Sequence, residues 1–600
     1  MIWRTSVLRT VLVTAFSSII SSAALAQTTV NSLSALKTYL DDNNANVKLS
    51  PGTYSIDAAD VASGAFGNPL LLVSGNNSTY DFTGVTLMID TDVFQAFGNV
   101  DVQEVAISGN GNVLKNLTMI DDGSVDDRPT RTALNILMDG EGNRVEGFHV
   151  TVKGSQPYAY GDAFGKGSGY AIKHFKHSAC LVRGNSNHVK NCTFIHRAYG
   201  HGIFMQGAVG ALIEGCYIEG EVRSTDDMLA ETSGPAYDRD FLTVWGYRLP
   251  PGYMMSLQED GIRTYTSGTT VVDGVSYTRH TSNITVRNCT IKYMRSGVSM
   301  PLGSGYRNAE DCTAIGCESG FGLRGGTIVN CSADVAYGPV YRTTYSNDNN
   351  LEADITVLPA SDPYYNGSGA IAWIGGNDHE ITLRGTENPV NQNLKVLIGG
   401  EFDDVRNLGT VDSHNASNVD IDNLTSYPLL LTSASSGTTG SSYGAITNNG
   451  SNNNVTNANR VVTIAKRSAL GYGIDGGNGA ANGQNVYLWG YNANNVNQQW
   501  QEIDRGNGYY TYQKQGTSYS IDGGNGGADR QNVYLWSTGP SNYNQHWQKV
   551  DKGGGYFQLR KRNSSGFAIN GGSGGTNGQN VNLYNSSSSS HNLQWRIQYQ

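Results

Sequence analysis

The stretch NHVKNCTF, residues 187–194, is one copy of a short pattern that recurs from residue 112 to residue 424. Each copy joins alternating apolar residues to a turn residue, which is followed by Leu, Phe or Cys. Eight copies fill that last position with Leu117, Phe148, Cys192, Cys216, Cys289, Cys312, Cys331 and Leu424. The closest copies are 24, 23 and 19 residues apart. Short strands separated by turns at such a period predict a β-solenoid, in which each coil stacks on the one before it.

The cysteines follow from this register. The chain has seven, and five of them share the repeated position with Leu and Phe. Unpaired Cys is among the residue types that are most often buried, where it packs as a small apolar side chain. We therefore expect buried thiols stacked in the solenoid core rather than a disulfide framework. No C-x-x-C or His/Cys spacing typical of a zinc site occurs, and no metal ligands are predicted.

The first residues predict a secretory signal peptide, residues 1–26. Arg4 and Arg9 precede an apolar run that ends at about Ile20, and small residues then lead to Ala24-Leu25-Ala26. This order of charged, apolar and small segments is typical of a cleaved signal, and the apolar run is too short to span a membrane. The sequence therefore predicts a secreted, extracellular protein with no membrane segment.

The next residues predict how the solenoid begins. Residues 32–42 (SLSALKTYLDD) have the pattern of a short amphipathic helix suited to cover the open end. The following VKLSPGTYSI, from Val47, resembles the strand, Pro-Gly turn and strand with which pectate-lyase-like β-helices begin. That resemblance implies an all-β fold, a right-handed parallel β-helix over residues 27–432. Residues 433–458 are rich in Ser, Gly and Asn and predict a flexible linker, with a last, degenerate coil as the alternative.

Three markers recur in the same order over residues 459–600. IDGGNG, IDGGNG and INGGSG begin at residues 474, 521 and 569, and each is followed by NVYLW or NVNLY and by a Q-x-W or L-x-W ending. These repeats resemble the ricin-type β-trefoil lectin, a sugar-binding module. The resemblance implies sugar contacts from an acid, an aromatic ring and an Asn/Gln pair. It implies a first site of Asp475, Trp489, Asn497 and Gln498, and a second of Asp522, Trp536, Asn544 and Gln545. In the third site Asn570, Tyr584, Asn592 and Leu593 occupy these positions, and we expect it to be weak or altered. The last Trp of each repeat is expected in the core.

A basic segment interrupts an acidic chain. Residues 163–213 contain no Asp or Glu although the chain has a formal net charge of −10, and they hold five of its eleven histidines. Such a concentrated positive field attracts polyanions, and the acidic remainder argues against nucleic acid as the partner. In acidic polysaccharides the uronate carboxylate makes β-elimination possible, for which Arg can bind the carboxylate and Lys, His or Tyr can move protons. An acidic, uronate-containing polysaccharide is the predicted partner, with alginate as first choice, and a monomer is expected.

The same segment resembles β-helix polysaccharide lyases of the chondroitinase B and alginate lyase type, which use a Lys and an Arg on neighbouring coils. Lys176 and Arg197 are 21 residues apart, about one coil, and are the predicted pair. Arg183 is the rival for the arginine. The layout is also similar to polysaccharide lyase family 31, in which Tyr and Lys are the acid and base. His196 and His201 are further catalytic candidates.

A long insertion separates Cys216 from Cys289, 73 residues later. Long insertions in a regular scaffold are usually functional, and this one is predicted to wall a cleft beside the basic segment. From it we select Tyr265 as the group that protonates the leaving oxygen. The predicted substrate contacts of the cleft are Lys173, His177, Arg183, Arg223, Asp260 and Arg263.

Two other functions stay open. Asp226-Asp227, Glu259-Asp260 and the YGHG turn at Tyr199 loosely resemble pectinase-like β-helix hydrolases, which use clustered Asp residues. A non-catalytic, carbohydrate-binding surface protein is the third class. Calcium is the one cofactor left open, through DDGSVDD from Asp121, for which a solvated turn is the preferred interpretation.

Overall fold

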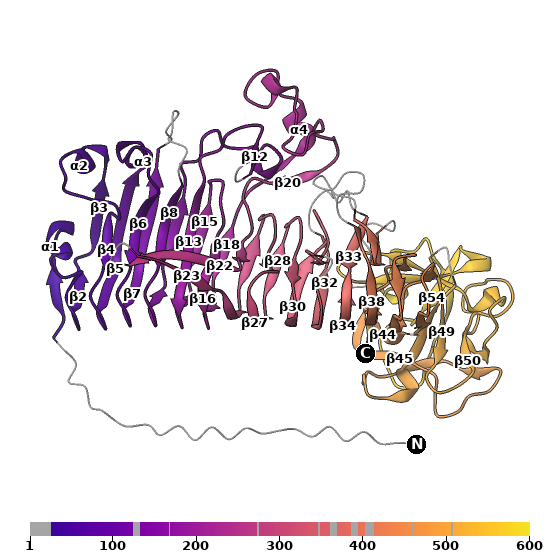
Figure 1. Ribbon diagram of the computed structural model, residues 1–600. Helices are drawn as coiled ribbons and strands as arrows, with labels where there is room; N and C mark the ends of the chain where they lie inside the picture. The colour runs from indigo at the N-terminus through magenta and orange to yellow at the C-terminus, as the bar shows by residue number, and fades with distance from the viewer. Residues whose placement is uncertain are drawn as a thin grey trace, which may run out of the picture. The chain divides into compact units, whose positions relative to one another are not determined.

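The computed structural model describes residues 26–123, 132–166, 169–272, 275–345, 348–360, 369–385, 394–402, 413–458, 460–505 and 508–599. The predicted signal peptide lies almost wholly outside these residues. The chain forms two compact units, Met1–Glu318 and Ser319–Gln600, and parallel strands of the solenoid type occur in both (Figure 1). None of the helices in the described ranges is long and apolar enough to cross a membrane.

The predicted coils are present in the first unit. Strands β9 (Arg144–Glu146), β14 (His188–Lys190), β17 (Leu212–Glu214) and β24 (Ser282–Arg287) pair in parallel, each with the next. Their central residues are in register and buried, and these are Val145, Val189, Ile213 and Val286. The stacking of like residues at one level is what makes the sequence pattern periodic. The prediction of a solenoid of parallel strands is confirmed.

The cysteine position is part of this core. All seven cysteines are buried and none is in a disulfide. Cys192, Cys216 and Cys289 lie on consecutive coils just after the strands above, and the Sγ of each points back towards the coil before it. Burial raises the pKa of the Cys180 thiol well above its usual range, so the thiol stays protonated. The prediction of stacked thiols in place of disulfides is confirmed.

The Asn that opens several copies of the pattern has a structural role. Asn112, Asn143 and Asn187 are buried at successive turns, and the side-chain oxygen of Asn187 accepts from the backbone N–H of Asn143, 2.8 Å away. Asn143 does the same for Asn112, also at 2.8 Å. Each amide therefore satisfies a backbone donor that would otherwise be buried without a partner, which is why Asn recurs there.

The start of the solenoid follows the sequence closely. Helix α1 (Leu33–Lys37) is shorter than the predicted helix, since its last turn closes at Thr38, and the hydroxyl of Ser32 caps its first turn. Leu33 and Leu36 are buried beneath it. Strands β2 (Asn46–Leu49) and β3 (Gly52–Ile56) flank the Pro-Gly turn as expected.

One face of the first unit is built by five strands that stack in parallel. They are β6 (Val102–Ile107), β8 (Ala133–Met138), β13 (His177–Asn185), β16 (Ile203–Val209) and β21 (Ile262–Thr264). The hairpin of β22 (Ser267–Val272) and β23 (Val275–His280) lies across these strands and packs on β16 (Figure 1). This face carries the candidate site.

The long insertion has two parts. After β18 (Tyr217–Glu219) the chain leaves the coil as β19 (Val222–Ser224), α4 (Thr225–Leu229) and β20 (Met254–Ser256), which rise above the strands in Figure 1. It then re-enters the solenoid as β21 and leaves again as the hairpin. The insertion is therefore loop and coil in turn, and its coil part brings Tyr265 into the stacked face.

Residues 433–458 are not a linker. They form β40 (Ser435–Ser436), β41 (Thr439–Ser442), β42 (Ile446–Asn448) and β43 (Asn454–Asn457), which continue the parallel stack from β38 (Ala416–Leu424) and β39 (Leu429–Leu431). Their polar side chains bind one another across coils; the Ser441 hydroxyl, for example, donates to Asp422 at 2.6 Å. The alternative of a last coil is correct, because ladders of polar side chains replace the apolar alternation that marks earlier coils.

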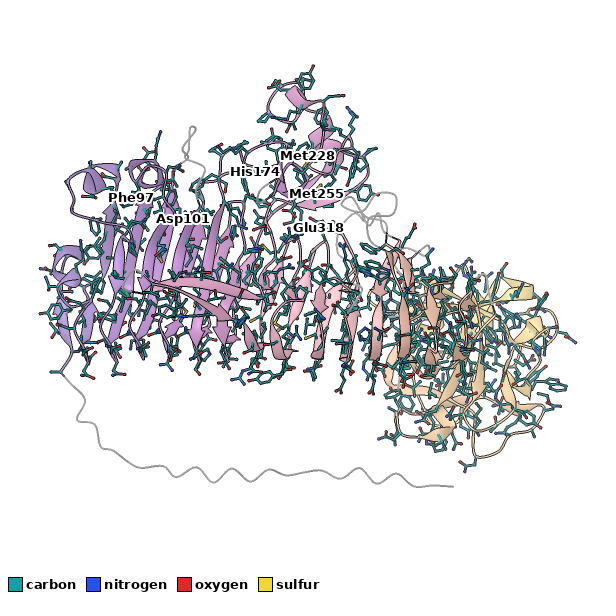
Figure 2. The ribbon with its side chains drawn as sticks, viewed as in Figure 1. Phe97, Asp101, His174, Met228, Met255 and Glu318 are labelled. Carbon is teal, nitrogen blue, oxygen red and sulfur yellow. The ribbon has the colours of Figure 1, made fainter. Side chains whose placement is uncertain are left out.

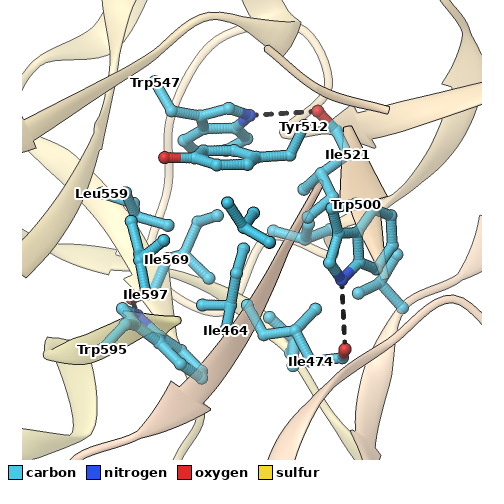
Figure 3. Close-up of a cluster of buried hydrophobic side chains, with 14 of the residues drawn as sticks. Ile464, Ile474, Trp500, Tyr512, Ile521, Trp547, Leu559, Ile569, Trp595 and Ile597 are labelled. Carbon is cyan, nitrogen blue, oxygen red and sulfur yellow. Dashed lines mark hydrogen bonds between the residues drawn. The ribbon is translucent and has the colours of Figure 1, made fainter. Parts of the chain in front are cut away.

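The C-terminal residues form the predicted trefoil, strands β44 (Arg460–Lys466) to β57 (Trp595–Tyr599). Trp500, Trp547 and Trp595 are fully buried, and the indole N–H of each donates to the carbonyl of an Ile in its own repeat at 3.0–3.3 Å (Figure 3). Ile464, Ile474, Ile521 and Ile569 pack with them in the core. The core role predicted for the repeat-ending tryptophans is confirmed.

Candidate functional site

A groove of about 380 Å³ lies on the stacked face of the first unit. Asp101, which lines it, is labelled in Figure 2, where Met228 and Met255 mark the insertion above the strands. Its other lining residues are Gln103, Thr132, Ala133, Leu134, Leu137, Lys176, Ser178, Leu181, Arg183, His201, Phe204, Gln206 and Tyr265. Four residues selected from the sequence therefore meet in one groove: Lys176, Arg183, His201 and Tyr265.

The floor of the groove is apolar. Leu137 and Leu181 lie one above the other on β8 and β13 and pack with Ala106, Leu134 and Phe204. Side chains alternate between the two faces of a strand, so these residues point outward while their neighbours fill the solenoid interior. An apolar strip flanked by charged and amide groups suits the C–H face of a sugar ring whose hydroxyls and carboxylate reach the sides.

One end of the groove holds a chain of polar contacts. The Lys176 ammonium forms an ion pair with Glu259. His201 Nε2 lies 3.2 Å from the Glu259 carboxylate and 2.7 Å from the Tyr265 hydroxyl. Lys176 is about a quarter exposed, whereas His201 is buried. The cation faces the groove and the imidazole supports the tyrosine from behind.

Burial sets the protonation states of these groups. It lowers the pKa of His201 to about 3 in spite of Glu259 nearby, so the imidazole is neutral near pH 7. Burial and the Glu259 carboxylate raise the pKa of Tyr265 well above its usual range, so the phenol keeps its proton. A neutral imidazole accepts, so Tyr265 O–H donates to His201 Nε2. Burial alone would raise the pKa of Glu259, but His201, Lys176 and Arg295 hold it below its usual range.

A buried ion cluster lies behind this chain. Arg295 pairs with Asp162 and, at 2.7 Å, with Asp260. The Tyr199 hydroxyl donates to Asp162 at 2.6 Å, and Arg263 lies 3.5 Å from Asp260. Asp260, predicted as a substrate contact, is thus a fully buried partner of arginines, and Arg263 also donates to Ser299. These residues position the segment that carries Glu259.

Other predicted residues lie outside the groove. His196 is fully buried in the coil interior, where its Nε2 lies 3.1 Å from the His201 carbonyl, and burial lowers its pKa to about 4. Arg197 binds Glu219 at 2.8 Å and Glu221 at 3.2 Å. The residue beside Lys176 on the next coil is Tyr199, because this coil is 23 residues long rather than 21. The prediction that Lys176 and Arg197 lie side by side is therefore wrong.

The remaining predicted contacts of the cleft are dispersed. Lys173 is exposed and does not line the groove. His177 is fully buried on the inner side of the sheet. Arg223 belongs to the insertion, where it pairs with Glu231 at 2.8 Å. The sequence reasoning missed Gln103, Ser178 and Gln206 in the groove, although their positions on the outward side of apolar strands could have revealed them.

In the trefoil, the aromatic side chains of the predicted sites are open to solvent. Trp489 and Trp536 are 42% exposed and Tyr584 is 38% exposed. Asp475 and Asp522 are 2% exposed; each accepts the N–H of the second glycine after it at 2.7 Å and bonds an Asn, Asn495 or Asn542. The acids therefore hold the loop beneath each ring, and their contact with sugar stays a prediction.

The amides of these sites are also bound within the protein. Gln498 and Gln545 are fully buried and donate to carbonyls near the exposed tryptophans. Asn497 and Asn544 donate to Asn478 and Asn525 at the loop surface. In the third repeat Asn570 accepts from Gly572 N–H at 3.1 Å, Asn592 accepts from Ser468, and Leu593 is buried.

Comparisons with known proteins concern this part of the chain. Residues 497–584 match a family model described as ricin-type beta-trefoil lectin domain-like. Among solved structures, the designed threefold-symmetric protein ThreeFoil is 31% identical over 23% of this chain and 96% of its own, with a TM-score of 0.21. The Rhizoctonia solani agglutinin is 19% identical over 24% and 96%, with a TM-score of 0.21. The exo-β-1,3-galactanase 1,3Gal43A of Clostridium thermocellum is 19% identical over 24% of this chain and 30% of its own, with a TM-score of 0.22. No curated protein matches the chain. The C-terminal region is a ricin-type β-trefoil lectin domain, and such a domain supports binding of carbohydrate.

Proposed function

We propose that the protein is a secreted polysaccharide lyase that cleaves an acidic polyuronate, with alginate as first choice, by β-elimination in the groove. The observation that carries this proposal is the contact chain of Lys176, Glu259, His201 and Tyr265 at one end of an apolar-floored groove. It combines a cation for the substrate carboxylate with a tyrosine whose proton has an acceptor. The lectin domain would hold the enzyme on its polymer and raise the local substrate concentration.

The groups divide the reaction as follows. Lys176 pairs with the C6 carboxylate of the reacting uronate and stabilises the charge that develops when C5 loses its proton. Tyr265 takes the C5 proton as its own proton passes to His201 Nε2. The C4–O4 bond then breaks, the C4=C5 double bond forms, and the phenol protonates the leaving O4 while it recovers a proton from His201. The proton lost from C5 is thus balanced by the proton gained at O4.

Arg183 serves a different sugar of the chain. It is seven residues after Lys176 in the same extended stretch, so the two Cα atoms are about 20 Å apart. One uronate cannot reach both cations, but consecutive uronates along β13 can. This spacing favours a polymer that lies along the strand direction. The hydrolase alternative has less support, since Glu259 and Asp260 are committed to ion pairs and Asp101 is the one carboxylate among the described lining residues.

The first test is the product. The protein is mixed separately with alginate, pectate and dermatan sulfate, and the ultraviolet absorbance of the unsaturated uronate is followed. We expect absorbance to rise with alginate in step with new reducing ends. New reducing ends without absorbance would instead indicate hydrolysis. Retention of the polymers without any cleavage would indicate a binding protein, and either result contradicts the proposal.

A second prediction concerns the lectin domain. Trp489→Ala combined with Trp536→Ala should weaken retention on immobilised polysaccharide about tenfold, because each exposed ring contributes about 0.5–1.5 kcal/mol to stacking. Affinity electrophoresis measures the retention. Leu470→Ala removes a similarly exposed apolar side chain of the same domain, 48% exposed, and should change nothing. Tyr584→Ala should have the smaller effect expected of an altered third site. Equal losses in all these variants would contradict the assignment of the rings.

A further inference from the structure

Three ionisable side chains meet inside the first unit, away from the groove and the lectin sites. Glu104 of β6, Asp121 of β7 (Val113–Asp122) and His177 of β13 are each 0% exposed. One ligand atom from each lies within 4.8 Å of the other two. The preferred interpretation of Asp121 from the sequence, a solvated turn residue, is wrong: its strand turns the carboxylate inward, whereas Asp122 beside it is exposed.

The surroundings orient all three groups towards one another. Asn135 of β8 donates from Nδ2 to Glu104 at 2.8 Å and to both Asp121 oxygens at 3.1 and 3.2 Å. The backbone N–H of Lys153 donates to Asp121 at 2.9 Å, and its carbonyl lies 2.7 Å from His177 Nδ1. Such outer partners, which fix the tautomer of an imidazole and the direction of carboxylates, are typical of metal ligands.

The cluster lacks positive charge. Burial and the Asp121 carboxylate raise the pKa of Glu104 well above its usual range, because two carboxylates so close cannot both ionise without a counter-charge. Glu104 Oε1 and Asn135 Oδ1 are buried and have no hydrogen-bond partner among the described residues. A buried acceptor left in this state costs about 1–3 kcal/mol.

The geometry between Glu104 and His177 matches a shared ion better than a hydrogen bond. His177 Nδ1 donates its proton to the Lys153 carbonyl, so the lone pair of a neutral imidazole is on Nε2. That nitrogen lies 3.7 Å from Glu104 Oε1, which is too long for a hydrogen bond. Two metal–ligand bonds of about 2.0–2.2 Å span up to about 4.2 Å, so one ion can contact both atoms.

We propose that Glu104, Asp121 and His177 bind one divalent transition-metal ion of the Zn²⁺ or Mn²⁺ class. Two carboxylates cancel the charge of such an ion, and an imidazole with carboxylates is a ligand set that these ions accept. Calcium, the ion that the sequence left open, prefers six to eight oxygen ligands and fits a histidine-containing set poorly. The prediction of no metal ligands is replaced by this proposal.

The site lies directly behind the groove. Gln103, Leu134 and Lys176 line the groove, and the residues that follow them, Glu104, Asn135 and His177, point to the interior, as alternation along a strand requires. Three successive coils contribute, since β6 pairs with β8 and β8 with β13. The ion would fasten these coils beneath Lys176 without touching substrate, and the proposal does not depend on the reaction in the groove.

The test is the metal content of the untagged full chain, produced in medium with Zn²⁺ and Mn²⁺ and measured by inductively coupled plasma mass spectrometry. We expect about one equivalent per chain, lost at least tenfold in His177→Ala and Glu104→Gln. His149→Ala, which removes an exposed histidine of β10 (His149–Val152), should keep the metal. Dialysis against a chelator should lower the melting temperature of the unaltered chain but not that of Glu104→Gln.

Two results would overturn the proposal. One is a chain without a stoichiometric ion even after incubation with excess Zn²⁺ or Mn²⁺, which would leave a proton shared by Glu104 and Asp121 as the explanation of the cluster. The other is an unchanged metal content in Glu104→Gln, which would place the ion elsewhere. Glu104→Gln keeps the shape of the side chain and decides the matter if His177→Ala fails to fold.

Discussion

Tyr265→Phe is expected to lower the turnover number on alginate about a hundred- to a thousandfold while the chain stays folded. The substitution removes one hydroxyl, which donates to His201 Nε2 at 2.7 Å and lines the groove. A positioned proton-transfer group contributes about 10²–10⁴ to the rate, and the phenol here performs both transfers. The ring remains, and with it the packing against Phe204 and the contact with Arg263.

The measurement is the initial rate of ultraviolet absorbance, with the melting temperature as the check on folding. Tyr277→Phe is the matched control, because Tyr277 is on the β23 hairpin strand and is 51% exposed. It should keep full activity. The Michaelis constant of Tyr265→Phe should change little, since Lys176 and Arg183 still bind the carboxylates. A variant with normal turnover would remove Tyr265 from the chemistry.

The parts of the fold that repeat could be predicted from the sequence. A position that returns once per coil, as at Cys192 and Cys216, reports stacking directly, and three copies of one trefoil repeat report its symmetry. The method failed where polar ladders replace apolar alternation, at residues 433–458. It also failed by two residues in pairing Lys176 with Arg197, since a coil length taken as 21 is in fact 23.

The site could be predicted only in part, because its contacts join distant segments. Lys176 was found from its basic neighbourhood and Tyr265 from the insertion, but Glu259, which links them, carried no signal of that role. The interior cluster was hidden for the same reason: Glu104, Asp121 and His177 come from separate coils, and each sits in an ordinary strand sequence. Which face of a strand a residue occupies decides its role, and one inward step turns a groove residue into a buried ligand.

The second large effect is expected from Arg295→Met, which should destabilise the first unit by about 3–5 kcal/mol. Arg295 is buried and pairs with two carboxylates, Asp162 and Asp260. Burial would lower the pKa of Arg295, but these carboxylates outweigh it and raise the pKa well above its usual range. Removal of one partner from a buried ion cluster leaves uncompensated charge in a medium of low dielectric constant, which is far costlier than the loss of an exposed pair. Arg263, 3.5 Å from Asp260, compensates only part of it.

Differential scanning calorimetry should show the transition of the first unit lowered by about 10 °C, as this loss implies for a domain of such size. Arg384→Met is the matched control: it breaks a bidentate pair with Asp354 whose side chains are 52% and 42% exposed, and it should cost less than about 1 kcal/mol. Equal shifts in the two variants would show that Asp162 and Asp260 find other partners. Because Asp260 adjoins Glu259 in the chain, a lowered transition should be accompanied by slower cleavage even below the melting temperature, as Lys176 loses the carboxylate that holds it at the groove.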